Sequence, residues 1–322
     1  MLKLKTPAFW RKKSFLSVLL CPLSIAYRFA RRCSELFSKP TAPEVPSITV
    51  GGITVGGSGK TPVAFSLYNM TKSIGRNPFI ISRGYGGRLS KAYVQKEHCF
   101  KDVGDEPLML TGMGCNVFIG KNKLKAAVEA QRLGADTLIF DDGLQTTSLK
   151  SNINFLVIDG NQGIGNAKLF PAGPLREPLS SALQRVDAVI FLGGNKHDIK
   201  IPGKILVFYA ETSVKAPTLR TKKAIAFCGL GFPDKFFSAL VSAGVSLAAT
   251  RTFPDHYCYK EKDINALIEM SIKLKAQLIT TRKDLIKIPF YLRRLLSVAD
   301  LDITWKSPDT VINFIKDRFI KT

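Results

Sequence analysis

Residues 53–62 of this chain read ITVGGSGKTP, and this stretch decides the fold. It continues the apolar run 47–54, and Pro62 suits the start of a helix because its ring fixes the first helical turn. The glycines allow backbone N–H groups to converge on one concavity, which is a geometry that binds phosphate. The strict pattern G-x-x-x-x-G-K-[ST] is not met, since Thr54 stands at its first glycine. We expect a strand, a phosphate-binding loop and a helix in direct succession.

In a loop of this kind the lysine reaches the β and γ phosphates, and the hydroxyl that follows it contacts Mg²⁺. Lys60 and Thr61 occupy these two positions. A glycine-rich Gly-Lys-Thr segment between a strand and a helix favours a phosphate site over an ordinary turn. The residues expected to bind the nucleotide are Thr54, Val55, Gly56, Gly57, Ser58, Gly59, Lys60 and Thr61.

Length, charge and cysteine content limit the class of protein. The 322 residues allow about two domains, each large enough for its own core. Lys and Arg number 47 against 25 acidic residues, so a membrane surface, a phosphorylated small molecule or a nucleic acid is the expected partner. Six scattered cysteines and only three histidines argue against a zinc site. Any metal is therefore expected to be Mg²⁺ on carboxylates and phosphates.

The amino terminus combines basic and apolar residues. Residues 1–33 hold eight basic side chains and no acidic one, around an apolar run at 14–27 that contains Pro22. A spanning helix needs roughly 20 apolar residues, and arginines follow the run where a signal peptide has its cleavage site. We expect residues 1–40 to form a membrane-associated helix that inserts its apolar face and binds anionic headgroups. The alternative is an ordinary amphipathic helix packed on the domain.

The rest of the chain alternates short apolar runs with amphipathic stretches, which predicts a mostly parallel sheet with helices on both faces. Residues 41–215 are expected to form a P-loop NTPase-like α/β domain, and residues 216–322 a smaller α/β domain that closes over the nucleotide. The boundary is placed in the polar stretch 210–221. The expected strands are 47–54, 78–82, 116–119, 137–140, 155–158, 188–192, 205–209, 224–228, 247–252, 277–280 and 301–305.

Acidic residues follow two of the predicted elements. Asp141 and Asp142 come directly after the strand 137–140, where open α/β sheets bind their ligands. Such a pair is usually a solvated turn, but its place after the glycine-rich loop in one sheet favours a role in holding a metal. Asp105, in Gly-Asp-Glu-Pro before an apolar helical stretch, is either the helix cap or a base for an attacking hydroxyl.

Three further motifs carry polar groups. Residues 83–88 read RGYGGR, which suits an anionic substrate or a mobile surface loop. Residues 170–178 read FPAGPLREP, a stiff loop that either positions phosphates and metal or forms a structural elbow. His256 lies in FPDHY at residues 253–257; a lone histidine there is usually a surface or packing residue.

Taken in order, the motifs resemble those of the tetraacyldisaccharide 4'-kinase family, the lipid A 4'-kinases. They read ITVGGSGKTP, SRGYGG, VGDEP, DDGLQ, PAGPLREP and FPDHY. The resemblance extends from about Pro22 to about Lys287. It implies ATP-dependent and Mg²⁺-dependent phosphorylation of the 4'-hydroxyl of the lipid A disaccharide precursor, at the cytoplasmic face of the inner membrane of a Gram-negative bacterium. It also implies two α/β domains with the nucleotide between them.

The resemblance also implies a role for each motif. Asp105 would be the base, and a pair with His256 would tune its acceptance of the sugar proton. The catalytic residues implied are Asp105, His256 and Lys60. The metal residues implied are Thr61, Asp141, Asp142 and Glu177. The substrate-binding residues implied are Arg83, Tyr85, Gly86, Arg88 and Arg176.

The sequence departs from the usual family pattern at five positions, none of which removes a proposed catalytic group. They are Gly52 for Asn, Lys123 for Arg, Thr146 for His, Phe232 for Asn and Arg282 for Glu. Lys123 and Thr146 bear on the substrate and metal contacts, because a lysine cannot form the planar two-point contact of an arginine.

Two functions other than that of a kinase would also use a phosphate-binding loop. One is a membrane-attached GTPase or ATPase switch, which would hydrolyse nucleotide without an acceptor and, if guanine-specific, would carry an Asn-Lys-x-Asp stretch. The other is a nucleic-acid-binding ATPase, which only the basic charge favours. The partners we expect are the lipid precursor and an anionic membrane surface, with no nucleic acid and no obligate protein partner.

Overall fold

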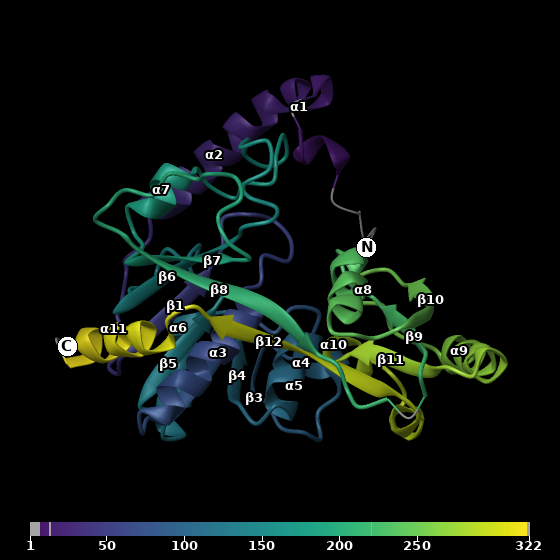
Figure 1. Ribbon diagram of the computed structural model, residues 1–322. Helices are drawn as coiled ribbons and strands as arrows, with labels where there is room; N and C mark the ends of the chain where they lie inside the picture. Colours follow the sequence, from purple (N-terminus) through teal and green to yellow (C-terminus); the bar gives the residue numbers. More distant parts are fainter. Residues whose placement is uncertain (1–6, 13, 220, 321–322) are drawn as a thin grey trace.

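The structure, a computed structural model, describes residues 7–12, 14–219 and 221–320. Lys3, Lys5 and Lys13 of the basic amino terminus lie outside the described residues. At the centre is one twelve-stranded sheet with the strand order β10-β9-β11-β12-β8-β7-β6-β1-β5-β2-β4-β3 (Figure 1).

The strands are β1 (Ser47–Gly51), β2 (Pro78–Ser82), β3 (Lys91–Tyr93), β4 (Asn116–Gly120), β5 (Thr137–Asp141), β6 (Ile153–Asp159), β7 (Ala188–Leu192), β8 (Leu206–Lys215), β9 (Ala224–Cys228), β10 (Leu247–Thr252), β11 (Gln277–Thr281) and β12 (Ser297–Trp305). The helices are α1 (Phe15–Leu19), α2 (Cys21–Leu36), α3 (Lys60–Ser73), α4 (Phe100–Val103), α5 (Asp105–Gly112), α6 (Lys123–Arg132), α7 (Leu179–Leu183), α8 (Pro233–Ser242), α9 (Glu261–Leu274), α10 (Arg282–Leu285) and α11 (Pro308–Ile320), with 3₁₀ turns η1 (Ala8–Trp10) and η2 (Phe290–Leu295).

The central strands are buried on both faces, which is why they read as continuous apolar runs and not as alternating ones. Every residue of β1, β2, β5 and β7 is buried. Helices α3, α5 and α11 contribute to the core on one face, and α6 and α7 contribute to the cores on the other. The predicted mixed α/β fold, with a large and mostly parallel sheet and helices on both faces, is therefore confirmed.

Two long antiparallel strands join two groups of strands into this one sheet. β12 pairs antiparallel with β8, from Asp300 opposite Lys215 to Trp305 opposite Ala210, and parallel with β11. We call β1–β8 the first group and β9–β12, with α8, α9 and α10, the second group. In Figure 1 the second group stands beside the first, with β8 and β12 running between them.

The stretch 210–221, in which the boundary is predicted, begins inside β8, which continues to Lys215 and so is longer than the expected strand 205–209. The polar side chains of residues 211–213 are exposed on a strand that leaves the buried part of the sheet, so they carry no apolar periodicity. The short strand β3 was also not expected; it pairs antiparallel with β4 at the sheet edge.

The last helix returns to the first group. Val311, Ile315 and Phe319 of α11 are buried in the same core as α3, and the indole of Trp305 donates a hydrogen bond of 2.8 Å to the hydroxyl of Ser66. The range 216–322, predicted as one domain, thus includes a helix that packs on the other group. The division of the chain into domains otherwise stays a prediction.

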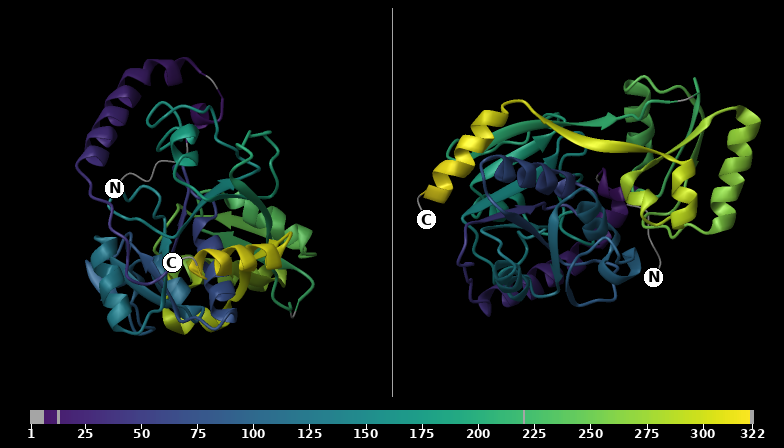
Figure 2. Two further views of the ribbon diagram at one scale, coloured as in Figure 1. Left: turned by 90° about the vertical axis from the view of Figure 1, so that its left-hand side faces the viewer. Right: turned by 90° about the horizontal axis from the view of Figure 1, so that it is seen from below.

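Helices α1 and α2 form an arm at the edge of the molecule (Figure 2). Two of their inward side chains are small and buried, Ser17 and Ser24, and the hydroxyl of Ser24 donates to the Leu169 carbonyl at 2.8 Å. Tyr27 also faces the domain, with its ring centroid 5.6 Å from that of Phe170. Their outward side chains are large and apolar, with Phe15, Leu19, Ile25 and Phe29 between 63% and 83% exposed. An ordinary packed amphipathic helix has the opposite arrangement. Among the described residues, no helix is both long enough and apolar enough to cross a membrane.

The packing of α11 on the first group predicts unequal effects of two equivalent substitutions. Ile315→Ala removes a buried side chain and should lower the free energy of unfolding by about 2–5 kcal/mol. Ile320→Ala, at an 83% exposed position of the same helix, should change it by less than about 0.5 kcal/mol. Urea unfolding followed by circular dichroism measures both; equal losses would mean that α11 does not pack as described.

Candidate active site

The glycine-rich loop lies between β1 and α3, as the sequence predicts. Gly56 and Gly59 have φ values of 113° and 80°, a region that side chains with a Cβ atom rarely adopt. Thr54 forms an antiparallel bridge with Leu175, and the Val55 N–H donates to the Pro174 carbonyl at 2.8 Å. Thr54 is therefore in extended backbone, where no glycine is needed, and the proline-rich loop 170–178 supports the glycine-rich loop from the side.

The lysine and threonine of the loop point at the acidic residues that end β5. The ammonium of Lys60 lies 3.3 Å from the Ser58 hydroxyl and 3.7 Å from Asp142 Oδ1. The Thr61 hydroxyl donates to Asp141 Oδ2 at 3.0 Å and lies 3.5 Å from Glu106 Oε2. Because β1 and β5 are parallel neighbours, the loop and the carboxylates meet at the same edge of the sheet.

Cations from two other elements hold the pair of aspartates. The buried Lys123 ammonium donates to the backbone carbonyls of Asp141 and Asp142. The Arg176 guanidinium binds both carboxylate oxygens of Asp142, at 2.8 and 3.0 Å. A lysine is sufficient at position 123, because its partners are two carbonyl oxygens, which need no planar two-point donor.

Asp105 and His256 meet across the two strand groups. Asp105 begins α5 in the first group, and His256 lies in the turn after β10 in the second; Asp105 Oδ2 and His256 Nδ1 are 2.5 Å apart. The residue at the cap position of α5 is Gly104, and Asp105 is the first residue of the helix. Asp105 Oδ1 accepts a hydrogen bond from the Glu106 N–H at 3.0 Å and so supports the first turn, whereas Oδ2 faces His256. The ring of Tyr85 lies beside the imidazole, with ring centroids 6.0 Å apart.

The three aspartates differ in their proton affinity. Burial would raise the pKa of Asp105, but the hydrogen bond to His256 and the charge of Lys283 outweigh it, so the pKa is below its ordinary value. Burial likewise opposes the charge of Asp142, but Lys60 and Arg176 lower its pKa. Burial and the neighbouring charge of Glu106 raise the pKa of Asp141 to about 6. Burial lowers the pKa of Lys123 to about 8, against the attraction of the two aspartates.

The residues at the end of β5 fit a divalent cation shared with phosphate oxygens. Asp141 Oδ1 is buried and accepts no hydrogen bond from the described residues. In the described part of the chain, no group of three or more His, Cys, Asp or Glu side chains could hold a metal alone. Mg²⁺ commonly binds one or two carboxylates and completes its octahedron with water and substrate phosphates, so a smaller set is sufficient.

Two predicted site residues lie away from this cluster. Glu177 is 2% exposed, and its oxygens bind Arg31 of α2, Arg185 and the Gln145 amide at 3.1, 2.6 and 3.0 Å. These partners compensate its charge, so its geometry favours a structural role over metal binding. Arg88 pairs with Asp102 of α4 at 2.5 Å and anchors the 83–88 loop.

Several residues at the site were not predicted. Lys283 of α10 contacts both members of the Asp105 and His256 pair, and Glu106 lies between Lys283 and Thr61. Glu106 follows Asp105 in the chain and could have been included on that ground. Lys283 carries no signal in the sequence, because its contacts join residues far apart in the chain.

The Asn-Lys-x-Asp criterion does not exclude a guanine nucleotide, because residues 195–198 read Asn-Lys-His-Asp directly after β7. Here the Asn195 side chain binds both backbone groups of Ile199, at 2.9 and 3.0 Å. The Asp198 carboxylate is exposed and pairs with Lys200 at 2.6 Å. The motif therefore closes its own loop, and this geometry disfavours a guanine-binding switch.

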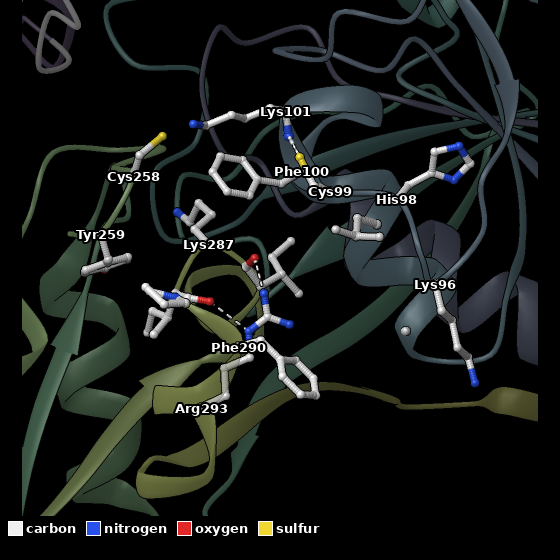
Figure 3. Close-up of a pocket in the computed structure, with 15 residues that line it drawn as sticks. Lys96, His98, Cys99, Phe100, Lys101, Cys258, Tyr259, Lys287, Phe290 and Arg293 are labelled. Atoms are coloured by element: carbon white, nitrogen blue, oxygen red, sulfur yellow. Dashed lines mark hydrogen bonds between the residues drawn. The ribbon is translucent and has the colours of Figure 1, made fainter. Parts of the chain in front are cut away.

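A cavity of about 660 Å³ opens between the strand groups on another side of α5 (Figure 3). Cys99, Phe100 and Lys101 line it from the first group, and Lys287 and Phe290 from the second. Neither Asp105 nor His256 is among its lining residues. The predicted site residues lie in the charged cluster at the ends of β1 and β5, so this cluster, and not the cavity, is the candidate active site.

Comparisons with known proteins identify the family and the fold. The family model described as tetraacyldisaccharide-1-P 4'-kinase matches residues 16–319. Proteins named tetraacyldisaccharide 4'-kinase from Paramagnetospirillum magneticum and Gluconobacter oxydans are 36% and 37% identical, over 95% and 97% of this chain and 96% and 98% of their own length. The solved structure of LpxK from Aquifex aeolicus in complex with ATP is similar in fold, with a TM-score of 0.78 at 24% identity, over 95% of this chain and all of that one.

The raised pKa of Asp141 predicts that the ionised carboxylate lowers the free energy of unfolding. The folded protein holds the Asp141 proton up to a pH of about 6, against an ordinary value of 3.8, so the folded state loses stability as the pH rises between these values. Asp141→Asn should therefore raise the free energy of unfolding at pH 8 by about 3 kcal/mol and leave it unchanged near pH 4.

Urea unfolding at the two pH values tests this effect of Asp141. Asp317→Asn, at an exposed position of α11, serves as the control and should show no gain at either pH. A variant Asp141→Asn that is no more stable than the wild type at pH 8 would contradict the assignment.

Proposed function

Because the chain belongs to the tetraacyldisaccharide-1-phosphate 4'-kinase family, and is thus a lipid kinase, we propose that Asp105, His256 and the glycine-rich loop transfer phosphate from ATP to the 4'-hydroxyl of the tetraacyldisaccharide 1-phosphate precursor of lipid A. The observation that carries the assignment of residues is the 2.5 Å contact between Asp105 and His256, at the edge of the sheet where the loop also lies.

The loop and its neighbours would bind the donor. The backbone N–H groups of residues 56–61 and the Lys60 ammonium would hold the β and γ phosphates. Thr61, Asp141 and Asp142 would hold Mg²⁺, which when bound offsets the negative charge of the phosphates. Arg176 holds Asp142 in place and adds a second positive charge near the transferred group. Charge stabilisation of this kind supplies most of the catalysis in phosphoryl transfer.

Asp105 would orient the sugar hydroxyl and accept its proton. Its low pKa keeps the carboxylate ionised at neutral pH, so it is a ready hydrogen-bond acceptor but a weak base. A weak base is sufficient, because in a loose transition state the hydroxyl needs alignment more than early deprotonation. Tyr85, exposed beside His256, offers an aromatic face to the disaccharide, and Arg83 and Gly86 share its loop.

The arm of α1 and α2 would bring this site to the membrane. Its outward Phe, Leu and Ile side chains suit the acyl region of a bilayer, and Arg11, Arg28 and Arg32 suit anionic headgroups. Arg31 and Ser24 attach the arm to the 169–177 loop beside the phosphate loop. We place the enzyme at the cytoplasmic face of the inner membrane of a Gram-negative bacterium, where ATP and the lipid precursor are both accessible.

The function is tested with the purified full chain, labelled ATP, Mg²⁺ and the disaccharide 1-phosphate in detergent. The label should appear on the lipid and depend on the acceptor. Protein that binds ATP and transfers no label to the lipid would reject the proposed function, and hydrolysis without acceptor would favour the switch.

Asp105→Ala should reduce turnover by at least about a hundredfold, because it removes the group that orients the hydroxyl. The Kd for ATP should change by less than about threefold, since Asp105 lies beside the acceptor and not on the phosphate loop. Steady-state kinetics and calorimetric titration give the two values. Equal losses in both would mean that Asp105 only supports the fold of α5.

The outward face of the arm predicts a loss of membrane binding on substitution with serine. The triple variant of Leu19, Ile25 and Phe29 to serine should bind anionic vesicles at least tenfold less, since each large side chain contributes about 1.5–3 kcal/mol when buried. Activity in detergent should be retained. The matched control changes Val128, Val241 and Ile272, which are exposed on other helices, to serine. Vesicle sedimentation measures both, and equal binding of the two variants would refute the arm as an anchor.

A further inference from the structure

Lys283 lies where the two strand groups meet. Its ammonium is 3.4 Å from His256 Nε2, 3.5 Å from Glu106 Oε1, 3.7 Å from Asp255 Oδ1 and 4.0 Å from Asp105 Oδ2. The side chain is 17% exposed. Burial would favour the neutral amine, but the three surrounding carboxylates raise the pKa above its ordinary value. Lys283 is therefore a cation held among four polar groups from two other segments of the chain, residues 105–106 and 255–256.

The start of α10 fixes the position of this lysine. Thr281 ends β11 and caps the helix, with its hydroxyl accepting from the Asp284 N–H at 3.1 Å and donating to Asp284 Oδ2 at 2.7 Å. Asp284 is fully buried and lies 2.9 Å from the ammonium of Lys287. Such a network leaves the helix little freedom, because separating its members would expose unpaired charges in the interior.

The contact with His256 restricts where the imidazole proton can be. A lysine ammonium has three donors and no acceptor, so an imidazole nitrogen at hydrogen-bond distance from it has to be the acceptor. His256 Nε2 is then unprotonated, and the ring carries its proton on Nδ1. Nδ1 faces Asp105 Oδ2, and an N–H donor is what that carboxylate oxygen requires.

Asp255 is the neighbouring group that would favour a proton on Nε2 of the His256 ring. Its Oδ1 lies 3.8 Å from His256 Nε2 and would attract a proton there, which would make the ring a cation. Lys283 lies 3.7 Å from the same oxygen, and the backbone N–H of His256 donates to it at 2.9 Å. These two donors satisfy Asp255 and reduce its attraction for a proton on the ring.

We propose that Lys283 is a positioning residue that holds His256 as the neutral tautomer protonated on Nδ1, so that His256 donates a hydrogen bond to Asp105. This role rests on the proposed function of Asp105 as acceptor of the sugar proton. With a neutral partner, Asp105 keeps its charge without a full ion pair, and so remains a better proton acceptor than it would be beside an imidazolium. Because Lys283 and His256 come from the second group, the arrangement is complete only when both groups are together.

The tautomer is measured by nitrogen NMR on the full chain labelled with ¹⁵N-histidine. The protein has only three histidines, His98, His197 and His256, so His256→Gln assigns the signals. In the wild type at pH 8, His256 Nδ1 should show the signal of a protonated ring nitrogen and Nε2 that of an unprotonated one. A wild-type spectrum with the proton on Nε2, or on both nitrogens, overturns the proposal without any variant.

Two substitutions at position 283 then test whether Lys283 determines the tautomer of His256. Lys283→Met should shift His256 toward the form protonated on Nε2 or on both nitrogens, and kcat should fall roughly tenfold to a hundredfold with little change in KM for ATP. Lys283→Arg keeps the charge and the donors and should retain the tautomer and most of the activity. Lys262→Met, exposed on α9, is the control. A Met variant that loses activity with an unchanged His256 spectrum overturns the positioning role.

The two readouts separate this inference from the proposed function. The spectrum needs no substrate, so it reports the tautomer even if the wild type transfers no phosphate to the lipid. If transfer occurs and the wild-type tautomer differs, the positioning role fails and the kinase assignment remains.

Discussion

Antiparallel pairing of β8 with β12 is the interaction on which the active site depends. It makes one sheet of two groups of strands and thereby brings the turn after β10 and the start of α10 against α5. The first group alone supplies the phosphate loop, the aspartates at the end of β5 and Asp105. The first residues of β12 pair with β11, and the following residues pair with β8. Only this double pairing brings His256 and Lys283 to Asp105. The candidate site is thus assembled by a long-range strand contact and not within either group.

In the candidate site, neighbouring groups shift the pKa values of two adjacent carboxyl groups in opposite directions. Asp141 and Asp142 are adjacent in sequence, yet burial and Glu106 make the first reluctant to ionise, whereas Lys60 and Arg176 stabilise the charge of the second. A buried carboxylate oxygen without a hydrogen-bond partner among the described residues lowers the stability of the fold. Under the proposed function the same oxygen would bind a cation, so the cost in stability and the affinity for Mg²⁺ would have one physical origin.

The sequence was most informative where local chemistry determines structure. The apolar runs at 78–82, 188–192 and 224–228 match β2, β7 and β9 in full, because strands buried on both faces leave no polar positions. It failed for the second half of β8, since residues 211–213 are exposed and are ordered by pairing with β12, about 90 residues further along the chain. Lys283 was missed for the same reason: its partners belong to segments that only the folded sheet brings together. Family resemblance, and not spacing, suggested the pairing of Asp105 with His256.

In the arm of α1 and α2, the large apolar side chains should tolerate changes of shape that a protein core does not tolerate. In a protein core, the shape of each apolar side chain matters because neighbours pack closely around it. The outward side chains of this arm are not enclosed by other described residues. Exchanges among Leu, Ile, Phe and Met should therefore be accepted freely there, and the proposed contact with the bilayer requires only that the residue stays apolar. The strict positions are Ser17 and Ser24, where a larger side chain would separate the helices from the 168–172 segment. In the arm, therefore, the buried serines have to stay small, whereas under the proposed function the large outward side chains have to stay apolar.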